Sequence, residues 1–187
     1  MKVLITGGAG FIGSHLADEL IKKQDEVFVI DDLSTGSRDN ITHLEDNKKF
    51  HFFEDTIMNE AVMENLVRDC DVIYHLAAAV GVKYILDNPL KSIQINVKGT
   101  EIVLELAGKL NKKVLIASTS EVYGKNPSSV FPETADSILG STKTSRWSYA
   151  CAKALDEFFA LDYEKEKNLP VIIVRFFNTV GPRQTGR

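Results

Sequence analysis

Two side chains capable of acid–base chemistry lie four residues apart in the second half of the sequence. Tyr149 and Lys153 are separated by about one helical turn, so a helix would present both on one face. A tyrosine hydroxyl with its reference pKa of about 10 is too weak a base at neutral pH, but a nearby positive charge favours the phenolate. A phenolate can remove a proton from a substrate hydroxyl. A surface aromatic–cation pair is the alternative reading of the same spacing.

A second group of polar side chains follows an apolar run at residues 114–118. It contains Ser118, Thr119, Ser120 and Glu121. In an open α/β sheet the ligand crevice lies outside the carboxyl ends of the strands, so a hydroxyl here would reach a reacting oxygen. A capping or loop hydroxyl is the alternative for an isolated segment of this kind.

Three glycines, Gly7, Gly10 and Gly13, separate the apolar run 2–6 from a helical pattern at 11–23. The start of a helix binds anions through its free N–H groups and its dipole, and glycine lets a phosphate approach closely. Asp31 ends the next apolar run. A carboxylate at this position accepts hydrogen bonds from the ribose hydroxyls and repels a 2′-phosphate. These features predict NAD as the cofactor. Arg38, in the following loop, leaves NADP as an alternative.

The elements that must position these residues alternate between strands and helices. Short, continuously apolar runs rich in Val, Ile and Phe are typical of parallel strands covered on both faces. The alternation predicts an α/β fold, a Rossmann doubly wound parallel sheet in the order 3-2-1-4-5-6 with helices on both faces. A long loop, functional or mobile, is expected at 124–145, and a polar segment at the end of the chain. The expected strands are 2–6, 26–31, 50–54, 72–76, 114–118 and 171–176, and the expected helices are 11–23, 57–67, 89–110 and 146–167.

Composition narrows the class of protein further. The chain has 187 residues, 44% of them hydrophobic and 26% charged, with a net charge of −4, which is typical of a folded domain and not of a nucleic-acid-binding protein. No apolar run approaches the length of about 20 residues needed to cross a membrane, and we expect a cytoplasmic protein. Cys70 and Cys151 are too few for a zinc cluster, so no metal is expected, and both are predicted to be buried.

The motifs together resemble those of the extended short-chain dehydrogenases/reductases, the NAD-dependent nucleotide-sugar epimerases, dehydratases and decarboxylases. The glycine loop Thr6–Gly13 is similar to the cofactor loop of that family, and Tyr149–Lys153 is similar to its Tyr-x-x-x-Lys motif. The resemblance covers the whole chain. It implies a catalytic set of Thr119, Tyr149 and Lys153, and a bound nucleotide-sugar, in this case a UDP-sugar.

The same resemblance implies which residues contact the two ligands. The expected substrate-binding residues are Thr119, Ser120, Glu121, Arg146 and Asn178. The expected cofactor-binding residues are Gly7, Gly10, Phe11, Ile12, Gly13, Asp31, Asp32, Ile57, Leu76, Ala77, Ala78, Asn96, Ser118, Tyr149 and Lys153.

Departures from the family pattern narrow the reaction. The family's acidic residue near adenine aligns with Thr56, with Asp55 just before it, and Ser120 follows Thr119 where dehydratases carry an aspartate, which argues against dehydration. Glu121 and Arg146 resemble residues of uronate decarboxylases and of an epimerase group that includes uronate epimerases. An arginine guanidinium suits a substrate carboxylate. A solvent-exposed arginine at the start of a helix is an equal alternative interpretation of Arg146. We expect C4 epimerisation of a UDP-hexose or UDP-uronate through a 4-keto intermediate, with decarboxylation of UDP-glucuronate as the alternative.

The resemblance also bears on domains and assembly. Residues 1–187 are expected to form an NAD-binding Rossmann domain, and the family's smaller C-terminal substrate domain is expected to be absent. Because that domain supplies binding energy, this polypeptide alone is expected to turn over weakly or to act as an NAD-binding module. A homodimer through the helices at 89–110 and 146–167 is expected from the family.

Overall fold

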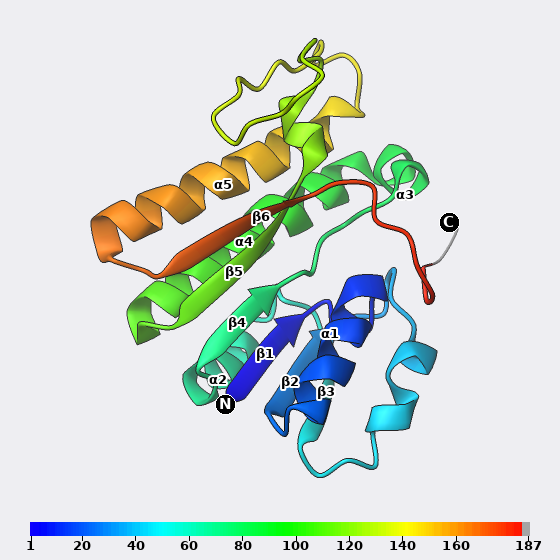
Figure 1. Ribbon diagram of the computed structural model, residues 1–187, viewed down its shortest axis with the longest axis vertical. Helices are drawn as coiled ribbons and strands as arrows, with labels where there is room; N and C mark the ends of the chain where they lie inside the picture. The colour runs from blue at the N-terminus through cyan, green and yellow to red at the C-terminus, as the bar shows by residue number, and fades with distance from the viewer. Residues whose placement is uncertain (185–187) are drawn as a thin grey trace.

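The sheet that the sequence predicts is present in the computed structural model, which describes residues 1–184 apart from the side chains of Val82 and Lys83. The strands run parallel in the order β3-β2-β1-β4-β5-β6, which confirms the Rossmann topology (Figure 1). Residues 185–187, the end of the expected polar segment, lie outside this description. The strands are β1 (Lys2–Thr6), β2 (Glu26–Asp31), β3 (Phe50–Glu54), β4 (Val72–His75), β5 (Lys113–Thr119) and β6 (Val171–Phe176).

The helices agree with the expected pattern to within two residues at most ends, and two differences are larger. The second expected helix starts three residues late, because the Asn59 side chain caps it by accepting a hydrogen bond from the Val62 N–H. A six-residue helix that follows Gly81 was not predicted, since it is too short to show an apolar period. The helices are α1 (Phe11–Lys22), α2 (Glu60–Asp69), α3 (Val82–Asp87), α4 (Pro89–Leu110) and α5 (Trp147–Lys167).

The helices cover the two faces of the sheet unequally. On one face α1 packs on β1–β3 through Ala17, Leu20 and Ile21. On the other face α2, α4 and α5 form the larger core, with Met63 and Val103 fully buried at its centre (Figure 1). None of the helices in the described part of the chain is long and apolar enough to cross a membrane.

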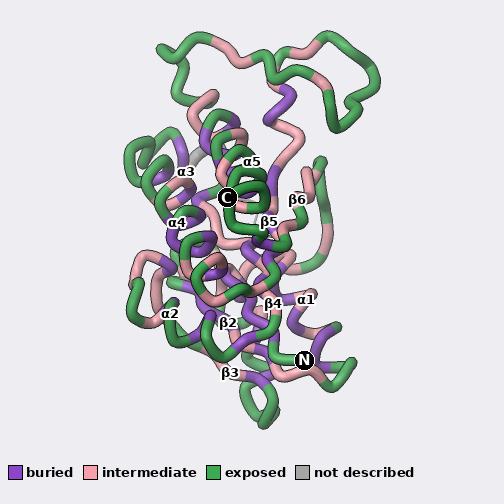
Figure 2. The backbone as a smooth tube through the Cα atoms, turned by 90° about the vertical axis from the view of Figure 1, so that its left-hand side faces the viewer, coloured by how far each residue is buried: buried purple, intermediate pink, exposed green. Residues whose placement is uncertain are grey.

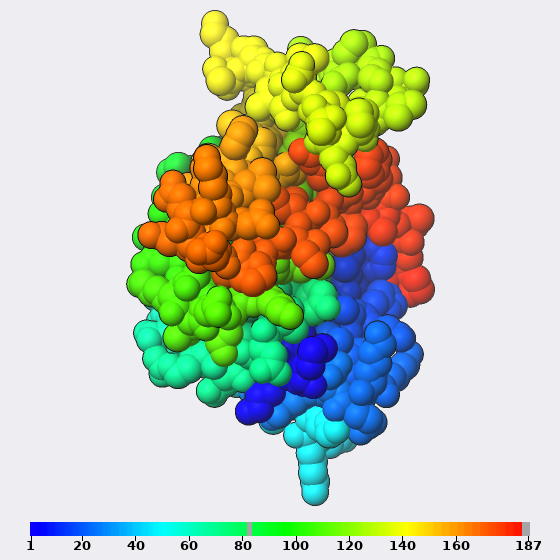
Figure 3. Space-filling model, turned by 60° about the vertical axis from the view of Figure 1, so that its left-hand side comes forward, coloured from blue at the N-terminus to red at the C-terminus, as the bar shows by residue number. Residues whose placement is uncertain are grey.

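The long loop expected at 124–145 is an irregular arm that projects from the body of the molecule (Figure 3). Most of its residues are exposed, as the green tube at the top of Figure 2 shows. It is anchored where the rings of Tyr123 and Phe131 stack with centroids 4.9 Å apart. One expectation was wrong: Cys70 is buried, but Cys151 is exposed on α5.

Candidate active site

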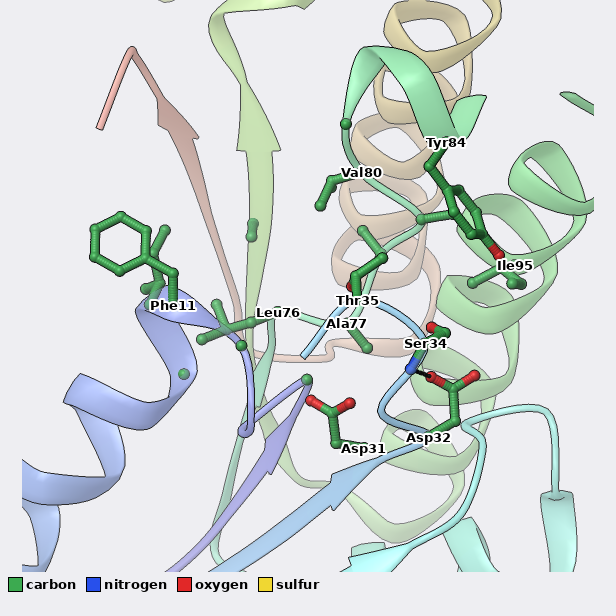
Figure 4. A pocket seen from close by; sticks show the side chains of 18 of the residues that line it. Phe11, Asp31, Asp32, Ser34, Thr35, Leu76, Ala77, Val80, Tyr84 and Ile95 are labelled. Atoms are coloured by element: carbon green, nitrogen blue, oxygen red, sulfur yellow. Dashed lines mark hydrogen bonds between the residues drawn. The ribbon is translucent and has the colours of Figure 1, made fainter. Parts of the chain in front are cut away.

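A cleft of about 940 Å³ opens at the carboxyl ends of the strands, where the topology places it (Figure 4). Fifteen of the sequence-predicted site residues line it. These are Gly7, Gly10, Phe11, Ile12, Gly13, Asp31, Asp32, Ile57, Leu76, Ala77, Ala78, Ser118, Thr119, Tyr149 and Lys153.

The glycine loop needs its glycines for two different reasons. Gly7 has φ +72°, and a Cβ there would lie 2.7 Å from the Ala77 backbone nitrogen, so the loop closes directly on the segment after β4. A Cβ on Gly13 would collide with the Gly7 carbonyl, so this glycine lets α1 pack on the loop. Gly10 caps α1 without a side chain and borders the cleft. The free N–H groups of the first helical turn are thereby left accessible to an anion.

Asp31 faces the cleft from the end of β2 with its carboxylate fixed (Figure 4). Its Oδ2 accepts a hydrogen bond from the Ala9 N–H and its Oδ1 one from the Leu33 N–H, both at 2.9 Å. Burial raises the pKa of Asp31, and these two N–H groups oppose the rise. Each oxygen retains acceptor capacity for a ligand hydroxyl.

Arg38 lies among carboxylates on the outside of this region. Its Nε donates to Glu45 at 2.8 Å and its Nη1 lies 3.5 Å from Glu54. Asp32, beside Asp31, accepts a hydrogen bond from the Ser34 N–H at 3.0 Å. Arg38 is thus held by Glu45 and Glu54 in exposed ion pairs, which does not favour the NADP alternative.

The segment after β4 is held by a buried polar cluster. Asn96 does not line the cleft; its amide group exchanges two hydrogen bonds with the Ala79 backbone, at 2.7 and 3.2 Å. The Thr6 hydroxyl accepts from the Ala77 N–H and donates to His75 Nδ1 at 2.8 Å. Asn96 and Thr6 thus shape the cleft wall from behind.

The Tyr149 and Lys153 pair lies on one face of α5, as expected. Burial raises the pKa of Tyr149 to about 12, and the carboxylates of Asp156 and Glu121 add to the rise. The Lys153 ammonium lies 3.2 Å from the Asp156 Oδ2, and both side chains are almost fully buried. The spacing of Tyr149 and Lys153 gives no sign of a carboxylate partner for Lys153, and no sign that burial raises the pKa of Tyr149 instead of lowering it.

The hydroxyl segment at the end of β5 is braced from behind. Ser118 donates to the Glu157 carboxylate, which receives two hydrogen bonds from Arg175, at 2.9 and 2.7 Å. Hydrogen bonding to Glu157 raises the pKa of Arg175. The Thr119 hydroxyl accepts from the Glu121 N–H and borders the cleft.

The remaining predicted substrate residues lie beside the cleft and not in it. Glu121 and Arg146 form an ion pair at 3.5 Å and line a small cavity of about 40 Å³ together with Tyr149. Ser120 follows Thr119 in a short 3₁₀ turn, and Asn178 is exposed after β6. The structure brings Glu121 and Arg146 next to Tyr149, but it does not bring Ser120 or Asn178 to the cleft wall.

Further residues line the cleft that the sequence analysis missed. They come from several places in the chain, among them the loop after β2, α3, α4 and the segment after β6, and Figure 4 shows Tyr84 and Ile95 facing the same space as Asp32. The missed short helix explains Tyr84, whereas Asp55 had been noted only as a neighbour of Thr56. Among them are Ser34, Thr35, Asp55, Val80, Tyr84 and Ile95, and Thr56, the position aligned with the family's residue near adenine, also lines the cleft.

Comparison with known proteins gives a consistent picture. A protein-family model described as GDP-mannose 4,6 dehydratase matches residues 4–187. The UDP-N-acetyl-alpha-D-glucosaminuronate decarboxylase of Bacillus cytotoxicus is 44% identical over 97% of this chain and 56% of its own length. UDP-glucuronic acid decarboxylase 1 of Arabidopsis thaliana is 39% identical over 98% of this chain and 41% of its own.

A solved structure adds the geometry. The UDP-glucuronic acid 4-epimerase of Bacillus cereus, in complex with UDP-glucuronic acid and NAD, superimposes with a TM-score of 0.88 at 34% identity, over 98% of this chain and 59% of that one. The chain therefore spans about half the length of the relatives it matches. Since the family model covers nearly the whole chain, the protein belongs to the family described as GDP-mannose 4,6 dehydratase, whose members here include nucleotide-sugar epimerases and decarboxylases.

Proposed function

We propose that the cleft binds NAD. The observation that carries this proposal is the pairing of a side-chain-free helix start at Gly10 with the fixed carboxylate of Asp31 on the next strand. The first suits a pyrophosphate and the second a ribose diol. The NAD in the related 4-epimerase structure supports the assignment.

We propose further that Tyr149, Lys153 and Thr119 act together on a sugar hydroxyl. NAD would supply the hydride acceptor. Thr119 and Tyr149 both border the cleft, so they can hold one substrate oxygen, and Tyr149 removes its proton. Because burial raises the pKa of Tyr149 to about 12, a further positive charge is needed to favour the phenolate, and the oxidised cofactor would supply it.

The substrate proposed is a UDP-uronate, oxidised at C4. Arg146 lies beside Tyr149 with its side chain 60% exposed, so it is free to exchange its contact with Glu121 for a substrate carboxylate. Two relatives named as uronate decarboxylases favour loss of CO₂ after oxidation. C4 epimerisation, the outcome expected from the sequence, is the second candidate and is favoured by the related 4-epimerase.

The reaction is tested by incubating the whole protein with NAD and, separately, UDP-glucuronic acid and UDP-glucose. A product lighter by CO₂ supports decarboxylation, and a product of equal mass with inverted C4 supports epimerisation. Conversion of UDP-glucose but not UDP-glucuronic acid would contradict the uronate assignment. Tyr149→Phe is the matched variant, expected to lower turnover about 10²- to 10⁴-fold while leaving NAD bound.

We also propose that two copies associate through α4 and α5. The outer face of α5 exposes Leu155, Phe158 and Leu161, and α4 exposes Leu90 and Ile93, with exposed fractions between 40% and 68%. Exposed apolar side chains gathered on adjacent helices are typical of an interface. Phe158→Glu is expected to convert a dimer to a monomer in analytical ultracentrifugation, and a wild-type monomer would contradict the proposal.

A further inference from the structure

Lys153 and Asp156 form a buried ion pair at the back of the cleft. Asp156 follows Lys153 by three residues on α5. Lys153 lines the cleft, whereas Asp156 does not. The ammonium and the carboxylate are 3.2 Å apart, and their side chains are 2% and 0% exposed. Two charges withdrawn from water to this extent are tolerated in a protein interior only when each compensates the other.

The polar groups around Asp156 are already committed elsewhere. Thr100 on α4 adjoins the carboxylate, but its hydroxyl donates to the Asn96 carbonyl at 2.7 Å. His75 on β4 lies 3.0 Å from the same hydroxyl through Nε2, and burial lowers the pKa of His75 to about 3, so it is neutral. Among the described residues, neither oxygen of Asp156 accepts a hydrogen bond. The Lys153 ammonium is therefore its main compensation.

The other charged groups near this end of α5 have partners of their own. Glu157 is bound by Ser118 and by the Arg175 guanidinium from β6. Glu121 pairs with Arg146 at 3.5 Å. Neither of these acidic residues is in an ion pair with Lys153 among the described residues, so Asp156 alone supplies the counter-charge in contact with it.

We propose that Asp156 is a positioning residue, whose carboxylate holds the Lys153 ammonium charged and in place so that the cofactor meets a cation at the back of the cleft. The pairing itself is independent of the cofactor. The consequence for the cofactor rests on the proposed NAD function.

The pairing is tested by urea unfolding from about pH 7 to pH 10 of Asp156→Asn, Lys153→Met and the double variant. A lysine buried without a counter-charge gives up its proton at lower pH than it does in the unfolded chain. Folded Asp156→Asn then binds fewer protons than its unfolded state, so its urea midpoint rises with pH relative to wild type. The double variant, which has no buried ammonium, should lose this rise and recover part of the stability lost in Asp156→Asn.

The outcomes separate positioning from simple packing. If Asp156 mattered only for its shape, the urea midpoint of Asp156→Asn would lie below that of wild type by the same amount at every pH. This result would overturn the proposal. If Asp156→Asn fails to fold, a folded double variant supports the pairing and an unfolded double variant contradicts it.

The consequence for the cofactor is tested by measuring the Kd for NAD over the same pH range. As the pH rises, the affinity of Asp156→Asn for NAD should fall at least tenfold more than that of wild type, because Lys153 loses its charge in the variant. An identical pH profile would overturn the cofactor role of Asp156. A wild-type protein that binds no NAD would refute the proposed function, while the unfolding experiment would still decide the pairing.

Discussion

The two halves of the sheet differ in how completely they are covered. In β2, four of six residues are buried, because α1 packs on one face and the larger core on the other. In β6 every residue is half-buried or exposed, and Ile172 is 62% exposed. The edge strand of the dinucleotide half, β3, is less enclosed than β2, since Phe53 and Glu54 are exposed. The clearer difference is that the half beside Tyr149 presents exposed apolar side chains on α5 and β6 and a projecting arm.

Charge follows the same division. Around the glycine loop, the groups that face the cleft are backbone N–H groups and one fixed carboxylate, Asp31. Around Tyr149, the cleft is braced from behind by paired side chains that link separate elements, such as Glu157 with Arg175. Backbone geometry of the first kind is set locally, whereas side-chain networks of the second kind depend on tertiary packing. Variants in the two halves should therefore fail in different ways.

The largest effect is expected at Gly13. Gly13→Ala would drive a Cβ into the Gly7 carbonyl, so we expect a loss of about 3 kcal/mol in the free energy of unfolding and no measurable NAD binding. Gly10→Ala is the matched control, since its Cβ meets only the Gly7 carbonyl at 3.2 Å. Gly10→Ala should keep the fold and lower the affinity for NAD. Equal behaviour of the two variants in calorimetry and urea unfolding would contradict the roles assigned to them.

His75, on the strand between the halves, should contribute acid sensitivity to the fold. Its pKa is lowered to about 3 by burial and then by the Lys153 charge, so the unfolded chain binds the proton more tightly. The contribution of His75 to stability is fully present above about pH 6.5 and is lost as the pH falls towards 3, by about 2 kcal/mol at pH 5, whereas burial raises the pKa of Asp156 to about 6 and acts in the opposite direction. In His75→Gln the slope of urea midpoint against pH should be shallower below about pH 6.5. An unchanged slope would show that His75 does not titrate.

Arg175 tests the Tyr149 half alone. Arg175→Leu leaves Glu157 without its two strong hydrogen bonds and frees the arm at the Glu133 carbonyl, now bonded at 3.0 Å. We expect a loss of about 1–2 kcal/mol in stability and faster proteolysis of the arm, with NAD affinity changed less than about twofold. Arg146→Leu, which breaks an exposed ion pair with Glu121 and a contact with the Trp147 ring, is the control and should be nearly neutral. A large loss of NAD affinity in Arg175→Leu would erase the distinction between the halves.

Asp31 tests the dinucleotide half with a smaller change. Asp31→Asn replaces a charged acceptor by a neutral one, so NAD affinity should fall about tenfold and the preference over NADP should narrow. Asp46→Asn, at an exposed position that does not line the cleft, is the control and should bind NAD as wild type does. Competition binding with both dinucleotides measures the effect. A preference for NADP in the wild type would contradict the role of Asp31.

The sequence predicted those parts of the molecule that depend on residues close together in the chain. The strands read as apolar runs, and β1, β2, β3 and β6 have the expected bounds. The glycine loop and the Tyr149–Lys153 spacing likewise placed most of the cleft. Partnerships such as Asp156 with Lys153 were missed in spite of their closeness in sequence, because a carboxylate on a helix carries no sign of burial. Tyr84 was missed because α3 is too short to show a period.

The most direct test of this account is native mass spectrometry of residues 1–187, first as purified and then with added NAD, on protein shown to be folded by circular dichroism. The account predicts one NAD per chain, lost in Gly13→Ala and weakened in Asp31→Asn. A folded wild-type chain that neither retains nor binds NAD would contradict the claim that this half of the sheet is a complete dinucleotide site.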